Sequence, residues 1–445
     1  MLDIKFIREN KEAIKEAVKN KGINLDLDEL LEIDEKRVGF LQEIEELNAK
    51  KNELNEEMKN GKDRDKIIAK GKRVKEKIME FEPRYKEAKR QFDELMVRVP
   101  NLVSSDTPIG KNSDDNVEIE RWEPPKFSAR GGSVIGGDFE PKDHVRLGKD
   151  LDILDLERGA KVGGYRGYYL KNEGALLVMA LMMHAMQKMV ERGYKPMIPP
   201  TLVKGFALFG SGYFSGLEYN GEVDEIYQVA TSDKEVDGTQ SKEKKFLVGT
   251  AEPSLLAYYS DETLEECQLP LRLCGYSQCY RSEIGSYGKD TKGFYRVHEF
   301  MKIEQVVITS ADVAESDKLQ DEMVSISKEI HQDLGLSYRL LRICTGDMSP
   351  GKHRAFDIEA WLPASNRWAE TGSASNFLDW QARRLNVKYV DKEGNRKFVY
   401  MLNNTALPSV RPFIAILENY QQKDGSVIVP EVLRKYVGKD VIGAK

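Results

Sequence analysis

The stretch CYRSEIGSYGKDTKGFYRVHEFMKIE, residues 279–304, decides the fold. Both of its ends have the aromatic and apolar residues of β-strands, and Gly285, Gly288 and Gly293 lie between them. Glycines that separate two strand-like runs are typical of a turn. The stretch therefore predicts a β-hairpin, made of a strand, a loop and a returning strand.

The charged residues of this hairpin suggest a nucleotide site. Arg281 and Glu283 are two apart and should face one side of the first strand. Arg296 and Phe300 should share a face of the returning strand. An arginine fork suits a phosphate, so the hairpin can clamp a purine on Phe300 while Arg281 binds the α-phosphate. An amphipathic hairpin with paired surface charges explains the same residues equally well.

Two segments nearer the C-terminus add similar chemistry. Residues 402–422 change from a strand-like run to a helix that begins around Val410, which puts Arg411 in the first helical turn, where a phosphate contact is plausible. Glu370 and Ser373 lie close together in the block 368–384, and a carboxylate with a hydroxyl can hold a Mg²⁺ that bridges phosphates. Taken alone, each of these features is more often structural.

The chain around these segments predicts an α+β domain. Helical patterns at about 173–192 and 311–334 alternate with β-like runs. The runs are 268–283, 294–309, 338–344, 355–361 and 398–402. Short connections between successive strands favour an antiparallel sheet with flanking helices over a doubly wound sheet. Residues 231–245 are polar and should form a loop, as should residues 284–293.

The first hundred residues have a different pattern. Apolar residues recur at alternating steps of three and four from Leu30 to Met58 and again from Ile67 to Val99, which is the seam of a coiled coil. A short turn joins the two runs, so we expect an antiparallel helical hairpin over about 29–98, with Pro83 bending its second helix.

Three parts follow from this division of the sequence. Residues 1–110 should form an N-terminal domain that contains the helical hairpin. Residues 111–125, in a stretch rich in Ser, Asp, Asn and Pro, should be a linker, and residues 126–445 should form the catalytic domain.

The charge of the chain is informative only when it is divided by segment. The 445 residues carry a net charge of −6, which argues against a general nucleic-acid binder. Residues 29–60 carry ten acids and five bases, a net of −5, whereas residues 62–98 carry thirteen bases and eight acids, a net of +5. Either these charges pair across the hairpin, or its basic flank contacts a polyanion. The clustered bases are Arg64, Lys66, Lys70, Lys72, Arg73, Lys75 and Lys77.

Several other classes of site are not expected. A Walker A motif ending at Gly288-Lys289 would need glycine at position 283, where Glu283 stands, and no G-x-S-x-G sequence is present. The five histidines and four cysteines lack the spacing of zinc ligands. Four scattered cysteines, no secretory start and no apolar run of about 20 residues favour a cytoplasmic protein without a membrane span.

Taken together, the motifs closely resemble those of bacterial/eukaryotic-type seryl-tRNA synthetases over essentially the full length. The blocks that carry the resemblance are GYKPMIPP (193–200), TAE (250–252), YRSE (280–283), RVHEF (296–300), ETGSASN (370–376) and NTALPSVR (404–411). Three regions look like motifs 1, 2 and 3 of class II aminoacyl-tRNA synthetases: 193–200, 279–304 and 404–411. Asn404 and Pro408 depart from the glycine or alanine common in motif 3.

The resemblance implies a class II antiparallel catalytic sheet and a homodimer with Pro200 at its interface. It implies that ATP and L-serine form seryl-adenylate and pyrophosphate, and that the seryl group then passes to tRNA(Ser), with AMP released and tRNA(Sec) as a second acceptor. The helical arm should bind the tRNA through Arg64, Lys66, Lys70, Arg73, Lys75 and Lys77. Mg²⁺ is the expected metal, and zinc is not expected.

The resemblance also implies a role for individual residues. The catalytic group is Arg281, Glu283, Glu370 and Arg411. Serine should contact Thr250, Ala251, Glu252, Glu304 and Thr405. ATP should contact Arg281, Ser282, Glu283, Val297, Phe300, Glu370, Thr371, Gly372, Ser373 and Arg411, and Mg²⁺ should bind Glu370 and Ser373.

Two other hypotheses fit the sequence less well. A paralogue that binds nucleic acid without aminoacylating it should have lost Arg281, Glu370 or Arg411, and all three are present. A ligase that transfers an amino acid to a carrier protein should lack the helical arm, which this chain has.

Overall fold

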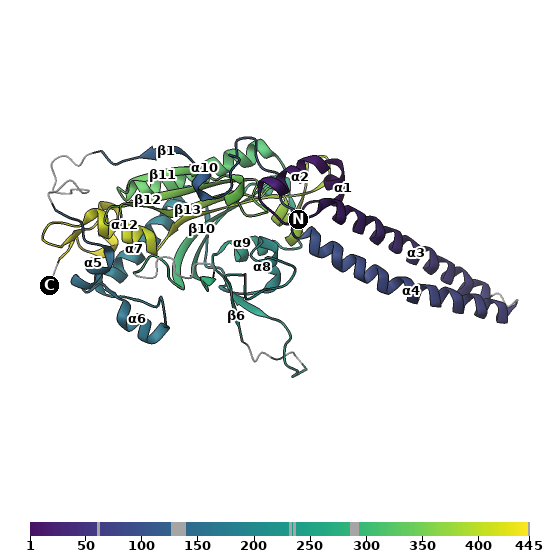
Figure 1. The fold of residues 1–445 in the computed structure, drawn as a ribbon. Helices are drawn as coiled ribbons and strands as arrows, with labels where there is room; N and C mark the ends of the chain where they lie inside the picture. The colour runs from purple at the N-terminus through teal and green to yellow at the C-terminus, as the bar shows by residue number, and fades with distance from the viewer. Residues whose placement is uncertain (60–62, 126–138, 231–233, 235–236, 285–292, 444–445) are drawn as a thin grey trace. The chain divides into compact units, whose positions relative to one another are not determined.

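The computed structural model describes residues 1–59, 63–125, 139–230, 234, 237–284 and 293–443. The chain forms two compact units, Met1–Pro100 and Asn101–Lys445. Figure 1 shows a helical first unit and a second unit built on a large sheet. Each unit is described by itself.

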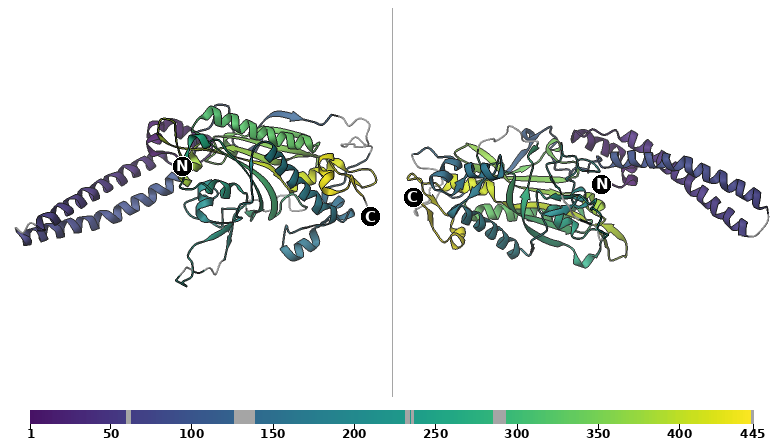
Figure 2. Two further views of the ribbon diagram at one scale, coloured as in Figure 1. Left: turned by 180° about the vertical axis from the view of Figure 1, so that it is seen from behind. Right: turned by 90° about the horizontal axis from the view of Figure 1, so that it is seen from below.

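The first unit is a small helical base with a long helical hairpin. Its helices are α1 (Ile4–Glu9), α2 (Lys11–Asn20), α3 (Leu27–Lys59) and α4 (Arg64–Met96). Helices α3 and α4 run side by side along their lengths, as all three ribbon views show (Figure 2). At 1.5 Å per residue, each of these 33-residue helices is about 50 Å long. The predicted coiled-coil arm is therefore confirmed.

Side chains at the predicted seam hold the arm together. Leu54 from α3 packs with Ile67, Val74 and Ile78 from α4 in a buried cluster. Nearer the base, the rings of Phe40 and Phe81 lie 6.2 Å apart. Pro83 lies inside α4, whose helical assignment runs from Arg64 to Met96 without interruption.

The second unit is built on an eight-stranded sheet of the described residues, in the order β1-β11-β12-β13-β16-β10-β9-β4. All neighbours in the sheet are antiparallel except β4 and β9. The strands are β1 (Val117–Trp122), β4 (Lys195–Met197), β9 (Leu271–Tyr280), β10 (Glu299–Thr309), β11 (Tyr338–Arg342), β12 (Arg354–Leu362), β13 (Arg367–Asn376) and β16 (Tyr400–Pro408). The predicted antiparallel sheet with flanking helices is confirmed.

Three helices cover one face of this sheet: α7 (Asn172–Glu191), α10 (Val313–Asp333) and α12 (Val410–Tyr420). The shorter helices α8 (Gly205–Ser211), α9 (Glu252–Ala257) and α11 (Trp380–Leu385) lie on the opposite face. Figure 1 shows this arrangement. Side chains alternate along each strand, so Ile303 and Val307 of β10 enter the core with α7, while Val306 packs beside α9. Even-numbered residues of β10, like Val306, therefore point to the second face of the sheet, which is the face covered by α8, α9 and α11.

Short elements complete the second unit. The helices are α5 (His144–Asp150), α6 (Leu156–Gly163) and α13 (Glu431–Val437). The strands outside the main sheet are β2 (Leu154–Asp155), β3 (Tyr169–Leu170), β5 (Leu202–Lys204), β6 (Tyr227–Val229), β7 (Lys245–Leu247), β8 (Thr263–Glu265), β14 (Lys388–Val390), β15 (Arg396–Phe398), β17 (Val427–Ile428) and β18 (Val441–Ile442). The polar segment 231–245 lies partly outside the described residues, as does most of 284–293.

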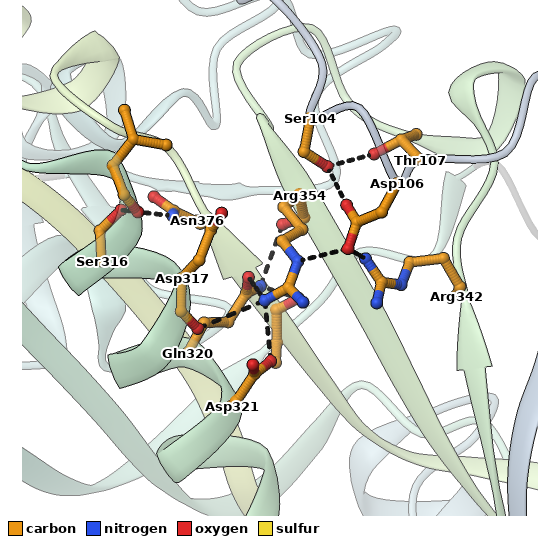
Figure 3. A network of polar contacts seen from close by, with 12 residues as sticks. Ser104, Asp106, Thr107, Ser316, Asp317, Gln320, Asp321, Arg342, Arg354 and Asn376 are labelled. Carbon is orange, nitrogen blue, oxygen red and sulfur yellow. Dashed lines mark hydrogen bonds and ion pairs between the residues drawn. The ribbon is translucent and has the colours of Figure 1, made fainter.

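The segment expected to be a linker is part of the second unit, which corrects the prediction for residues 111–125. Its strand β1 pairs with β11 at the edge of the sheet. The segment before it is also held in place by Asp106. This carboxylate accepts hydrogen bonds from Ser104 and Arg354 and forms an ion pair with Arg342 (Figure 3). Polar and proline-rich composition signalled a loop, but it did not reveal that distant arginines bind this loop.

Candidate active site

A pocket opens on the second face of the sheet, between β10, β13, β16 and the first turn of α12. Nine of the predicted substrate-binding residues line it: Arg281, Glu283, Val297, Phe300, Glu370, Thr371, Gly372, Thr405 and Arg411. Lys302, Tyr295, Arg296, Pro408 and Val410 complete the lining. The fold thus brings together residues that are up to 130 positions apart in the sequence.

The hairpin differs from the prediction in one respect. Strand β9 ends at Tyr280 and β10 begins at Glu299, so Arg281, Glu283 and Arg296 lie beyond the strand ends. Glu283 has a φ of 56°, which no strand residue adopts. Strand parity therefore does not orient these three side chains, although all three line the same pocket as Phe300.

Arg281 is fixed by backbone hydrogen bonds to the opposite side of the hairpin. Its amide N–H donates to the carbonyl of His298 at 2.9 Å, and its own carbonyl lies 2.9 Å from His298 Nδ1. The guanidinium carbon lies 5.5 Å from the centre of the Phe300 ring. The pocket therefore places a cation beside an aromatic face, the combination expected for a nucleotide clamp.

Glu283 is held by two arginines. Arg166, which follows α6, donates to its carboxylate at 3.2 Å, and Arg296 donates at 3.3 Å. Paired charges across the hairpin, the alternative reading of this sequence, are thus also present. Sequence analysis missed Arg166, because it lies more than a hundred residues from the hairpin and has no distinguishing local pattern.

Arg411 lies where α12 begins and contacts β13. Its Nη1 donates to the carbonyl of Glu370 at 2.6 Å and lies 3.3 Å from the Glu370 carboxylate. Withdrawal from water opposes ionisation of that carboxyl, but the charges of Arg411, Arg281 and Lys352 outweigh it and lower the pKa of Glu370. Glu370 is therefore an ionised acceptor surrounded by cations.

A second carboxylate beside Glu370 was not predicted from the sequence. Asp357 of β12 lies opposite Ser373 of β13 and accepts a hydrogen bond from its hydroxyl. Burial, together with the negative charge of Glu370, raises the pKa of Asp357 to about 7. Two repelling carboxyls and a hydroxyl form a set of hard oxygen donors that fits Mg²⁺. No cluster of three or more His, Cys, Asp or Glu side chains suited to a metal occurs in the described ranges.

Lys302 lines the pocket, and Glu304 lies two residues further along β10. Both are almost fully buried and form an ion pair, and Glu304 also accepts from Thr250 Oγ1 at 3.0 Å. Lys302 Nζ donates to Thr405 Oγ1 at 3.1 Å. The hydroxyl of Thr250, just before α9, and that of Thr405, on β16, therefore contact one buried ion pair. The sequence did not indicate Lys302 as a site residue, nor its contacts with Glu304 and Thr405.

Glu252, at the start of α9, forms a second buried polar group. Its carboxylate accepts from Tyr213 at 2.8 Å, Gln381 at 2.7 Å and Asn403 at 2.8 Å. Burial, together with the charge of Glu304, raises the pKa of Glu252 to about 7 despite these donors. Neither residue was identified from the sequence, because Tyr213, just after α8, and Gln381, on α11, lie in segments with no distinguishing local pattern.

Six predicted contact residues are not among those that line the pocket: Thr250, Ala251, Glu252, Ser282, Glu304 and Ser373. Ala251 packs into the apolar cluster beneath α9 and is fully buried. Ser282 lies between two lining residues, and its amide is directed at the carbonyl of Glu225 at 3.4 Å. Ala251 therefore supports the site from below.

The predicted RNA-contacting residues all lie on the exposed surface of α4. Lys66 pairs with Asp63 at 3.4 Å, but the other six bases of the cluster have no carboxylate partner among the described residues. Every ion pair within the described part of α3 and α4 joins residues close together on one helix. The opposite charges of the two helices therefore do not pair across the hairpin.

Comparison with known proteins agrees with this geometry. Residues 1–103 match the family model for the seryl-tRNA synthetase N-terminal domain, and residues 230–420 match that for the class II tRNA synthetase core domain (G, H, P, S and T). The serine–tRNA ligase of Treponema denticola is 41% identical over the whole of both chains. That of Deinococcus radiodurans is 38% identical over 100% of this chain and 99% of its own.

This chain belongs to the seryl-tRNA synthetase family. It is accordingly a class II aminoacyl-tRNA ligase, and the resemblance predicted from its motifs is confirmed. Two solved members have the same architecture. The seryl-tRNA synthetase of Pyrococcus horikoshii complexed with ATP superposes with a TM-score of 0.85 at 34% identity over the full length of both chains. The cytoplasmic serine–tRNA ligase of Naegleria fowleri in complex with AMP gives 0.83 at 30% identity, covering 100% of this chain and 99% of that one.

Proposed function

We propose that this chain joins L-serine to tRNA(Ser) in two steps. The serine carboxylate attacks the α-phosphate of ATP, which releases pyrophosphate and forms seryl-adenylate. The terminal adenosine of the tRNA then takes the seryl group, and AMP leaves. The observation that carries this proposal is one pocket lined by Arg281, Arg411, Glu370, Lys302 and Thr405, in which Lys302 also pairs with the buried Glu304.

The outer part of this pocket should bind ATP. Arg281 lies beside Phe300, so a purine stacked there brings its α-phosphate to the guanidinium, which stabilises the charge that develops during attack. Arg411 should bind the γ-phosphate. Glu283 should accept from the adenine edge, with Arg166 and Arg296 keeping its carboxylate in place. We assign Mg²⁺, which would neutralise and bridge the phosphates, to Glu370 and Ser373, with Asp357 as a further donor.

The inner part should bind serine. A pocket rejects alanine when the loss of the substrate hydroxyl leaves its own buried polar groups unpaired. Thr250, Glu304 and Thr405 supply such groups, and all lie within one hydrogen-bonded set. Glu252 is a buried carboxylate close enough to Glu304 for the charge of Glu304 to raise its pKa, and we assign it to the serine ammonium.

Serine-dependent ATP–pyrophosphate exchange tests this assignment. We expect exchange with serine and at least a hundredfold less with alanine at equal concentration. Thr405→Val removes one hydroxyl while preserving shape, and should reduce the preference for serine over alanine more than it reduces exchange itself. Equal exchange with serine and alanine in the unaltered protein would refute the serine assignment.

We further propose that one flank of α4 binds the tRNA. Arg64, Ile68, Lys72, Lys75 and Met79 follow one another at steps of three or four and share a face. On this face the bases lack carboxylate partners among the described residues, and Ile68 and Met79 are more than half exposed. Free cations suit phosphates, and exposed apolar side chains suit sugars and bases.

The other predicted bases lie on the opposite flank of the seam, which provides a matched control. Lys66, Lys70, Arg73 and Lys77 share that face. We expect Lys72→Glu with Lys75→Glu to raise the tRNA KM about tenfold or more and to lower the slope of log affinity against log salt by about two. Lys70→Glu with Lys77→Glu changes charge equally and should have a smaller effect. A larger effect from the control pair would show that the flank with Lys70 and Lys77 binds the tRNA instead.

A homodimer is supported by an apolar surface on α7. Leu176, Met179, Met183 and Val190 are each about half exposed and fall on one side of the helix. Ile198, in the predicted motif 1, is 85% exposed. Exposed apolar side chains grouped in this way mark interaction surfaces. We expect Met183→Glu to convert a dimer to a monomer in light scattering; a monomeric unaltered protein would contradict the proposal.

Two further assignments concern a second tRNA and the location of the protein. Contacts to phosphates do not depend on the nucleotide sequence, so the arm should also bind tRNA(Sec). A charging assay with that tRNA would test this. No helix in the described residues is long and apolar enough to cross a membrane. Cys267, Cys274, Cys279 and Cys344 are free thiols, which fits the proposed cytoplasmic location, testable by fractionation.

A further inference from the structure

A buried histidine–carboxylate pair lies behind the ATP-binding part of the pocket. Glu418 of α12 is fully buried, and one of its oxygens accepts from His144 Nδ1 at 2.9 Å and from the His144 amide at 3.3 Å. The other oxygen accepts from the amide of Ala364 at 3.1 Å. The carboxylate therefore fixes His144, the first residue of α5, in one orientation.

The second ring nitrogen of His144 contacts the returning side of the hairpin. The amide of Phe294 donates to His144 Nε2 at 3.3 Å. These two contacts define the tautomer, because a ring that donates from Nδ1 to Glu418 keeps a lone pair on Nε2. At Gly293, which has a φ of +105°, an added Cβ would lie 3.1 Å from the same nitrogen. The imidazole and the backbone are thus closely fitted.

Phe294 is well placed to transmit this contact to the pocket. Its ring is fully buried, with its centre 4.6 Å from that of Tyr168 and 5.7 Å from that of Phe413. The next three residues line the pocket. The guanidinium carbon of Arg411 lies 4.8 Å from the Tyr295 ring, and Arg296 binds Glu283.

We propose that His144, oriented by Glu418, is a positioning residue for ATP: it holds the Phe294 amide and thereby fixes where Tyr295 and Arg296 enter the pocket. The pair also links the two phosphate-binding segments, since Glu418 lies two turns after Arg411 on α12. This role rests on the proposed assignment of the pocket to ATP. The ring of His144 forms hydrogen bonds with Glu418 and Phe294, neither of which is assigned to serine, so ATP binding should depend on His144 selectively.

Two conservative substitutions separate the two ring nitrogens. The amide of asparagine reaches the position of Nδ1, so His144→Asn keeps a donor to Glu418 but leaves the Phe294 amide unpaired. The amide oxygen of glutamine reaches the position of Nε2, so His144→Gln keeps an acceptor for Phe294. We expect His144→Asn to raise the ATP KM in pyrophosphate exchange about tenfold, with the serine KM within twofold of the unaltered protein. His144→Gln should recover most of the ATP KM.

Controls distinguish positioning from general destabilisation. His184→Asn alters another largely buried histidine–carboxylate pair, with Asp333, outside the pocket, and should leave both KM values unchanged. If His144→Asn does not fold, Glu418→Gln replaces it as the test variant and should also raise the ATP KM. Folded His144→Asn or Glu418→Gln with an unchanged ATP KM overturns the proposal, as does an equal rise in both KM values. Failure of the unaltered protein to exchange with serine would instead refute the proposed function.

Discussion

The arm and the active-site pocket use charge in opposite ways. On α4, six bases of the predicted cluster have no carboxylate partner among the described residues and lie in solvent. In the pocket, Lys302, Glu304, Glu283 and Arg411 each contact an opposite charge within 4 Å. Exposed charges are screened by salt and can bind any phosphate that approaches, whereas buried charges must be paired and therefore keep a fixed geometry. The first arrangement suits a long polyanion, and the second suits a small transition state.

The largest expected effect comes from removing a fixed pocket cation. Arg281→Gln should lower the rate of adenylate formation about 10²–10³-fold, because it removes charge stabilisation at the α-phosphate. A single-turnover assay of adenylate formation measures this rate. Arg272→Gln, on β9 of the same hairpin but paired with Glu322 away from the pocket, is the matched control and should retain the rate. Similar losses in both variants would show that the hairpin, not the cation, was damaged.

The pH dependence of serine binding tests the buried carboxylate of the pocket. Because the pKa of Glu252 is raised to about 7, its ionised fraction grows between pH 6 and pH 8, and the serine KM should fall over that range. Glu252→Gln cannot ionise, so its serine KM should be roughly tenfold to a hundredfold higher at pH 8 and flat with pH. A parallel pH profile in the two proteins would contradict this role.

The same carboxyl predicts the sign of a stability change. A pKa raised on folding stabilises the protein below the unfolded value near 4.5, and that contribution is lost as the pH rises through about 7. The melting temperature of the unaltered protein should therefore fall relative to that of Glu252→Gln between pH 5 and pH 8. The opposite trend would mean that folding lowers the pKa of Glu252, which would require a cation close to its carboxylate.

A smaller, confined effect is expected from the seam of the arm. Leu54→Ala removes a buried side chain from the cluster with Ile67 and Val74, and should cost about 2–3 kcal/mol within the arm. Hydrogen exchange should accelerate in α3 and α4, and the tRNA KM should rise severalfold. Pyrophosphate exchange should not change; a matching loss there would mean that the pocket depends on an intact arm.

The smallest effect is expected where the arm's bases are already paired. Arg90 contacts both Glu87 and Glu94 at 2.6 Å on the exposed surface of α4. Such exposed pairs add little, so Arg90→Ala should change the tRNA KM less than twofold and leave the melting temperature unchanged. An effect as large as that of the Lys72 and Lys75 variant would show that pairing does not separate binding from non-binding bases.

The two regions also differ in how far the sequence alone could predict them. The arm's seam depends on neighbours three and four residues apart, so its heptads predicted both helices within a few residues. In the second unit, local patterns signalled the strands β9, β10, β11, β12 and β16 and the helices α7, α10 and α12. Strand β13 was not predicted as a strand, since the block 368–384 drew attention only as a pair of metal-binding side chains. The linker prediction for residues 111–125 failed because β1 pairs with β11, more than two hundred positions away.

The sequence by itself determined the family, the helical arm and most of the pocket residues, because these depend on periodicity and on motifs read within one segment. Tertiary structure alone decided which groups meet: Arg166 with Glu283, Lys302 with Thr405, Asp357 with Ser373, and His144 with the Phe294 amide. Each pairing joins separate segments of chain or adjacent strands, so no local pattern could reveal it. Their charges and hydrogen bonds are fixed only when the sheet brings the strands together and excludes water.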